Sequence, residues 1–370
     1  MKKIVTLILL STVVFYACKN DGPSGPDVSD FDRQAILENW ADEIIIPAFT
    51  SFEKQTSRLD SAGVAFTTEP TMENLKELRS EWEDAYISFQ HVSMFEMGRA
   101  MELRYRDNLN IYPTDTAEIQ QNIEEDSYNL ELPSLNNSQG FPALDYLLFG
   151  LAESDSDILA HYTSNTNAEN YRNYLGDLTS RIDELTSQVL NDWTENYRDE
   201  FVQNSANSSN SSVDMMVNDY IYYYEKNLRA GKVGIPAGVF SGTPLSTHVE
   251  AYYHGNLSKT LLKEAIDASQ NFFQGNHFNS TGKGESLESY LDFLNTMKQG
   301  ADLSELINNQ FLLAKSEAEN LDENFSMQVE LDNSKMLETY DKLQKNVVLL
   351  KVDMLQALNI NVDYVDADGD

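Results

Sequence analysis

The stretch LKELRSEWEDAYISF, residues 75–89, carries the pattern that decides the fold. Its apolar residues recur at spacings of three and four, namely Leu75, Leu78, Trp82, Ala85, Tyr86 and Phe89. Charged residues fall between them and occupy the opposite side of a helix with about 3.6 residues per turn. The stretch therefore predicts an amphipathic helix whose apolar stripe faces a core.

The same spacing recurs along the chain. It appears in Tyr171, Tyr174, Leu175, Leu178, Ile182, Leu185, Val189 and Trp193, and again in Met336, Tyr340, Leu343, Val347, Leu350 and Met354. Alternating strand patterns are not convincing anywhere, so we predict an all-α protein of two helical bundles with no significant sheet. Pro47 is expected to kink or interrupt the first helix, because proline lacks an amide proton and crowds the preceding turn.

The composition excludes one class of partner. The chain of 370 residues has 26 Lys and Arg against 60 Asp and Glu, which gives a formal charge of -34. A field of this sign repels phosphate backbones, so no nucleic-acid partner is expected. Most of these charges are expected to form a solubilising surface.

Polar segments divide the chain. The stretch NSANSSNSS, residues 204–212, cannot bury enough apolar surface to offset the entropy of ordering it, so it predicts a surface loop or linker. It separates an N-terminal bundle, residues 31–203, from a C-terminal bundle, residues 213–361. Residues 362–370 are predicted to be a disordered acidic tail, since the start of a calcium loop in DYVDADGD lacks the closing glutamate.

The N-terminus resembles a bacterial lipoprotein signal. Lys2 and Lys3 precede a short apolar run that ends at Cys18, the single cysteine of the chain. We predict a signal peptide over residues 1–17, a lipid anchor on Cys18 and a flexible tether over residues 18–30, rich in Gly, Pro, Ser and Asp. The alternative is an uncleaved anchor, although the run is short for a membrane span. An outer-membrane lipoprotein is favoured, on the periplasmic side or at the cell surface.

Several short blocks in order resemble the imelysin-like family. They are WADEIIIPAFTSF (residues 40–52), SEWEDAYISFQHVSMFEMGRA (80–100), NIYPTD (110–115), GFPALDYLLFG (140–150), RNYLGDLTSRI (172–182) and GKVGIPAGVFSGTPLSTHVEAYYHGNLS (231–258). The resemblance implies two helical bundles in one lipoprotein or periplasmic protein. It also implies an association with bacterial iron uptake in many members, and a metallopeptidase designation for the founding ones.

The family signature, Gly-x-His-x-x-Glu, is degenerate in this chain. Gly140 stands at the glycine position, Pro142 at the histidine position and Asp145 at the glutamate position. Residues three apart share a helix face, so the family pair could reach one metal ion, but proline offers no lone pair. We favour helix initiation by Pro142, with Ser138 or Gly140 as cap, over metal ligation.

Other acidic residues could complete a metal site. The resemblance directs attention to Glu96, Asp115 and Asp145, an oxygen-only set suited to Ca²⁺, Mg²⁺, Mn²⁺ or ferric iron. The competing interpretation, which we prefer, is that Asp115 caps a helix that starts at Thr116 and that Glu96 is solvated. Glu250 matches a glutamate of the family's C-terminal block, and on a helix it would share a face with His254.

The remaining histidines give no ligand pattern. His248 is two residues from Glu250 and would lie on another helix face, and His91, His161 and His277 have no partner at ligand spacing. No His-Glu-x-x-His helix, nucleophilic triad or phosphate-binding glycine loop is present in the sequence.

The sequence thus predicts a non-enzymatic accessory of iron, other metal or haem acquisition at the cell envelope. Its partners would be the membrane, through Cys18, and a TonB-dependent receptor or another uptake component. The cofactor is left open, with iron or another divalent or trivalent metal as the candidate. The alternatives are a metallopeptidase of the imelysin type and a binding protein for another envelope ligand.

Overall fold

The computed structural model describes residues 28–298 and 300–364. The predicted signal peptide, Cys18, most of the tether and residues 365–370 of the predicted tail lie outside these residues. No helix within the described ranges has both the length and the apolar character that crossing a bilayer would require.

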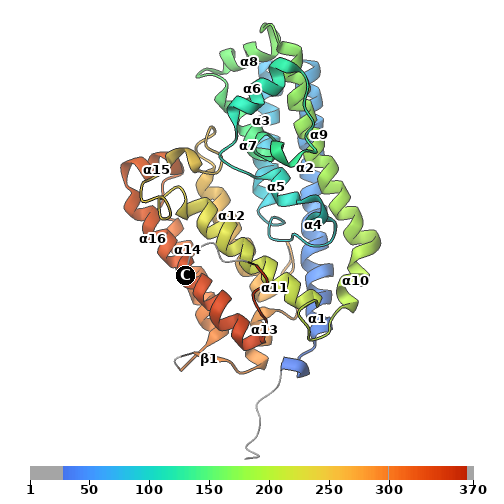
Figure 1. The fold of residues 1–370 in the computed structure, drawn as a ribbon, viewed down its shortest axis with the longest axis vertical. Coiled ribbons are helices and arrows are strands. Elements are labelled where there is room, and N and C mark those ends of the chain that lie inside the picture. Colours follow the sequence, from blue (N-terminus) through green and yellow to red (C-terminus); the bar gives the residue numbers. More distant parts are fainter. Residues whose placement is uncertain (1–27, 299, 365–370) are drawn as a thin grey trace, which may run out of the picture.

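Helices make up both halves of the chain (Figure 1). The first half contains η1 (Val28–Asp30), α1 (Arg33–Glu38), η2 (Asn39–Ile45), α2 (Ile46–Thr68), α3 (Met72–Phe89), α4 (Arg99–Leu103), α5 (Tyr105–Leu109), α6 (Thr116–Glu125), η3 (Pro133–Ser138), α7 (Gly140–Asp145), η4 (Tyr146–Gly150), α8 (Asp155–Thr163), α9 (Ala168–Asp192), η5 (Trp193–Tyr197) and α10 (Arg198–Gln203).

The second half begins after a short loop. It contains α11 (Ser212–Tyr222), η6 (Tyr223–Gly234), η7 (Ser246–His248), α12 (Ser258–Gln274), α13 (Leu287–Phe293), β1 (Met297–Lys298), β2 (Ala301–Asp302), α14 (Leu303–Ala318), α15 (Phe325–Leu331), α16 (Asn333–Val348), η8 (Leu349–Met354) and α17 (Leu355–Leu358). The two short antiparallel strands form a hairpin in which Met297 pairs with Asp302. The all-α prediction is confirmed, and this hairpin is a small addition to it.

The apolar stripes form the core. In the first half, α2 packs against both α3 and α9, and in the second half α16 packs against α14 and η6 (Figure 1). All six stripe residues of residues 75–89 are buried, as are the eight of the Tyr171–Trp193 stripe. In the third stripe Tyr340 alone is partly exposed. Buried residues of both halves belong to one continuous hydrophobic cluster.

The first helix changes type next to Pro47, while its backbone stays helical from Arg33 to Thr68. Pro47 lies at the start of α2, directly after η2, a π-helical segment. Proline at this position cannot donate to the carbonyl of Glu43, four residues earlier. That carbonyl oxygen instead accepts the backbone N–H of Phe278 at 2.8 Å. This replaced hydrogen bond ties the first helix to a loop of the second half.

The loop between the halves is closed by hydrogen bonds. The N–H of Ser212 donates to the Asn204 carbonyl at 3.0 Å, and Ser211 caps α11 by accepting the Asp214 N–H at 3.2 Å. Ser211 also accepts a hydrogen bond from Arg33 at 2.8 Å, and Arg33 pairs with Asp214 at 2.5 Å. The end of the serine-rich stretch is thus buried against α1.

Candidate functional site

The motif helix α7 starts at Gly140, where any side chain would force neighbouring backbone atoms to move. Gly140 has a φ of +74°, and a Cβ built on it would lie 2.2 Å from the carbonyl oxygen of Leu109. Trp82 of α3 donates from Nε1 to the Phe141 carbonyl at 3.2 Å. The start of α7 is therefore held between α5 and α3.

Pro142 is the third residue of α7 and is buried. The first four N–H groups of a helix have no intrahelical acceptor, so the missing amide proton of proline costs nothing here. The predicted caps are wrong, because Gln139 precedes the helix and makes no side-chain cap bond, while Ser138 Oγ donates to the Leu135 carbonyl at 3.0 Å. The fixed backbone angle of Pro142 and the conformation of Gly140 shape this helix start instead.

Asp145 connects the two halves of the protein. Its side chain is buried, and its two carboxyl oxygens accept the backbone N–H groups of Tyr253 and His254, each at 2.8 Å. Burial raises the pKa of Asp145 to about 7, and the two hydrogen bonds oppose that rise. Both oxygens of this motif position therefore already have protein donors.

Tyr253 and His254 lie in a turn, which corrects the expected helix face. Ala251 has a φ of +54° and Gly255 a φ of +79°, values that a helix does not contain. Glu250 and His254 consequently do not share a helix face. The His254 Nε2 atom lies 2.7 Å from the Glu83 carboxylate of α3, and its ring packs 4.7 Å from that of Phe149.

Glu250 forms a buried ion pair with Lys232. Lys232 also donates to Gln90 Oε1 at 2.8 Å, and Asn110 donates to Glu250 Oε1 at 2.8 Å. Tyr86 extends this chain by donating to Asn110 at 2.5 Å. Burial lowers the pKa of Lys232, while the Glu250 carboxylate opposes that change. A polar network thus links α3, η6 and the turn that carries Glu250.

Glu96 is not solvated as expected. Its carboxyl group accepts the Arg106 N–H at 3.1 Å, and the Arg106 guanidinium pairs with Asp219 of α11 at 3.0 Å. Asp219 also accepts the Glu96 N–H at 2.6 Å. Burial raises the pKa of Glu96 to about 7, an effect that Arg106 opposes. These three residues line a cavity of about 370 Å³.

Asp115 and the other histidines have structural partners. Asp115 caps α6 by accepting the N–H groups of Ala117 and Glu118, at 3.1 and 3.0 Å, which is the role that the sequence favours. His91 and His277 each lie 3.3 Å from a carboxylate distant in the sequence, and His248 makes its hydrogen bond to Thr247. His161 Nδ1 is buried and has no hydrogen-bond partner among the residues that the structure describes.

The motif positions do not fit a bound metal. Pro142 has no donor atom, and the oxygens of Asp145 receive two amide hydrogens, so a cation there would have to displace both. Across residues 28–298 and 300–364, no group of three or more His, Cys, Asp or Glu side chains is arranged to hold a metal ion.

Sequence reasoning missed the cations of these networks. Lys232 lies in AGKVGIPAG and is the one charged residue of that stretch, in a chain with few basic residues. A lysine in such apolar surroundings is a signal for a buried ion pair. The sequence around Arg106, RYRDNLN, and around Asp219, VNDY, is typical of surface segments, so it does not predict that these two side chains form an ion pair.

Known proteins share this fold. A proposed iron-regulated protein A precursor from Parabacteroides distasonis ATCC 8503 matches with a TM-score of 0.74 and 16% identity, covering 91% of this chain and 97% of that one. An imelysin-like protein from Psychrobacter arcticum 273-4 matches with a TM-score of 0.64 and 16% identity, covering 90% and 97%. At these identities the structures show a common fold alone.

The sequence comparisons identify the family. No curated protein sequence matches this chain significantly. The family model described as imelysin, of the peptidase M75 type, matches residues 45–351, which is more than half of the 370 residues. The chain therefore belongs to the imelysin family.

Proposed function

We propose that this protein is a non-enzymatic accessory of iron, other metal or haem acquisition, attached to the cell envelope by a lipid on Cys18. The observation that carries the non-enzymatic part is the position of Asp145. Its two carboxyl oxygens accept the amides of Tyr253 and His254, and Pro142 replaces the remaining ligand of the family motif. The motif serves as a structural joint between the two halves.

The link to iron rests on similarity. A protein of the same fold from Parabacteroides distasonis is described as iron-regulated protein A, and the imelysin-like resemblance implies iron uptake for many members. An accessory of this kind would act with a TonB-dependent receptor or another uptake component at the outer membrane. The acidic surface, with 60 acidic against 26 basic residues, suits a partner with a basic face.

A deletion strain of the source organism tests this function. We expect the deletion to grow more slowly than wild type when an iron chelator limits growth, with either a ferric salt or haem as the iron source. The wild-type gene should restore growth, whereas Cys18→Ala should restore it poorly and move the protein out of the membrane fraction. Growth is measured in parallel cultures with and without chelator.

Two outcomes would oppose the proposal. Equal growth of deletion and wild type on every limiting iron source would remove the uptake role. Metal-dependent cleavage of casein by the purified protein, abolished by a chelator and restored by Zn²⁺, would favour the metallopeptidase alternative.

A further inference from the structure

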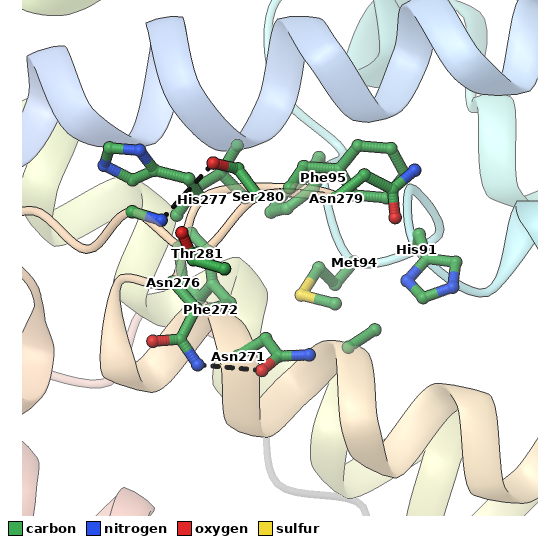
Figure 2. A pocket seen from close by; sticks show the side chains of 14 residues that line it. His91, Met94, Phe95, Asn271, Phe272, Asn276, His277, Asn279, Ser280 and Thr281 are labelled. Atoms are coloured by element: carbon green, nitrogen blue, oxygen red, sulfur yellow. Dashed lines mark hydrogen bonds between the residues drawn. The ribbon is translucent and has the colours of Figure 1, made fainter.

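A second cavity lies on another part of the molecule, away from the motif helix. It has a volume of about 620 Å³ and opens between η2, the segment that follows α3, and the loop that follows α12 (Figure 2). Its size falls within the range of small-molecule sites, roughly 300–1,000 Å³. The networks of Asp145, Glu250 and Glu96 do not line it.

The lining contains two histidines and no other side chain that titrates. None of the 14 lining residues is Asp, Glu, Lys or Arg, although the chain as a whole carries a formal charge of -34. His91 and His277 stand at opposite ends of the cavity (Figure 2), and each faces a carboxylate outside the lining, Glu264 or Glu43, at 3.3 Å. The lining itself thus offers no lysine or arginine for an anionic ligand, and the two carboxylates nearest to it face its histidines.

Uncharged hydrogen-bonding groups border the cavity. Asn271 accepts a hydrogen bond from Asn276 at 2.9 Å, which leaves the amide N–H groups of Asn271 available. The side chains of Asn279 and Thr281 make no hydrogen bond with other residues in the described part of the chain. Amides and hydroxyls both donate and accept, so they match ligands whose hydroxyl groups do the same.

The floor of the cavity is apolar and aromatic. Met94, Phe95 and Phe272 are buried beneath it, and the rings of Phe95 and Phe272 meet edge to face at 5.4 Å. Phe278 is partly exposed and packs edge to face with the His91 ring at 5.5 Å. An accessible aromatic ring, that of Phe278, with polar groups beside it suits a ligand that has one apolar face and polar edges.

The loop over the cavity is held in place by its own backbone. The N–H of His277 donates to the Gly282 carbonyl at 2.9 Å, and the N–H of Gly284 donates to the Gly275 carbonyl at 3.0 Å. The N–H of Phe278 is used by Glu43, as described above. These bonds fix the two ends of the loop, and the side chains between them border the cavity.

Gly282 brings the loop close to its own histidine. A Cβ at this position would lie 2.1 Å from Nδ1 of His277. A glycine there lets the backbone pass close to the imidazole ring, where a larger residue would displace that ring.

We propose that this cavity binds a neutral saccharide of one or two sugar rings. The amides of Asn271 and Asn279 and the hydroxyl of Thr281 bind ring hydroxyls, while the C–H face of a sugar lies against the partly exposed ring of Phe278. This activity is separate from the proposed role in metal acquisition, and neither depends on the other.

Calorimetric titration of the full chain tests the proposal with defined sugars. The probes are maltose, cellobiose, lactose and N,N′-diacetylchitobiose, with glucuronate and galacturonate as anionic comparisons, each up to about 10 mM because weak saccharide sites have dissociation constants near the millimolar range. We expect at least one neutral disaccharide to bind, and the uronates to bind more weakly or not at all.

Variants locate the site. Asn271→Ala combined with Asn279→Ala should weaken binding about tenfold, as expected for losing hydrogen bonds at two exposed side chains. Asn191→Ala, an exposed asparagine on α9, is the matched control and should bind as wild type does. The proposal is overturned if no neutral sugar binds, if binding is unchanged in the double variant, or if the uronates bind as tightly as the neutral sugars.

Discussion

Asp145→Ala should lower the free energy of unfolding by about 3 kcal/mol. The substitution leaves the N–H groups of Tyr253 and His254, two partly buried residues, without these acceptors, and an unpaired buried donor costs roughly 1–3 kcal/mol. Removal of a buried side chain also opens a small cavity. Denaturant unfolding followed by far-ultraviolet circular dichroism measures the change.

The control is an aspartate with no buried partner. Asp199 is 74% exposed and pairs with Arg198, so Asp199→Ala should change stability by less than about 0.5 kcal/mol. A loss for Asp145→Ala no larger than that of the control would mean that Asp145 does not join the two halves.

The effect of Asp145 should also depend on pH. Because the folded-state pKa is about 7, above the ordinary value of 3.8, the folded protein keeps a proton that the unfolded chain releases between these values. The contribution of this carboxyl group to stability therefore falls as the pH rises from about 4 to about 7. The difference between wild type and Asp145→Ala should be larger at pH 5 than at pH 8.

Glu250→Ala should be at least as destabilising, by about 4 kcal/mol. The change leaves the Lys232 ammonium buried with one remaining acceptor, Gln90, and removes the acceptor of Asn110. Breaking a buried ion pair by removing one partner typically costs about 3–5 kcal/mol, because an uncompensated charge stays in the interior. Thermal and denaturant unfolding measure the loss.

A double variant separates charge burial from packing. Lys232→Met with Glu250→Leu removes both charges at similar volume, so it should be more stable than Glu250→Ala alone. If the double variant is instead as unstable as the sum of the two single changes, the two residues act independently and the network interpretation is wrong.

The helices could be predicted because their signal is local. The stripe from Leu75 to Phe89 repeats with the helical period, and each of its residues lies in the core of the structure. Pro47 marked a missing backbone hydrogen bond in the first helix for an equally local reason, since proline removes one backbone donor. The N–H of Phe278 replaces the missing donor to the Glu43 carbonyl. Phe278 lies more than two hundred positions from Glu43, so the sequence around Pro47 does not predict this hydrogen bond.

The partners of the acidic residues could not be predicted. In the sequence, Asp145 occupies one position of a two-residue motif. Its partners in the structure are two backbone amides of a turn, and every residue except proline has such an amide, so no residue type in the sequence identifies them. The helix face expected for Glu250 and His254 failed because Ala251 adopts a positive φ that its residue type does not suggest. Glu96 was expected to be solvated because its neighbours in the sequence do not reveal the packing of Arg106 and Asp219 against it.

Calorimetric titration of the purified protein with Zn²⁺ and with Fe³⁺ tests most directly whether the motif is a structural joint and not a metal centre. Wild type and Asp145→Asn are compared in the same buffer, with thermal melts to show that both are folded. Because Pro142 has no lone pair and Asp145 is already hydrogen-bonded, we predict no stoichiometric binding that depends on Asp145. Tight binding of one ion per chain by the wild type, lost in a folded Asp145→Asn variant, would contradict this account.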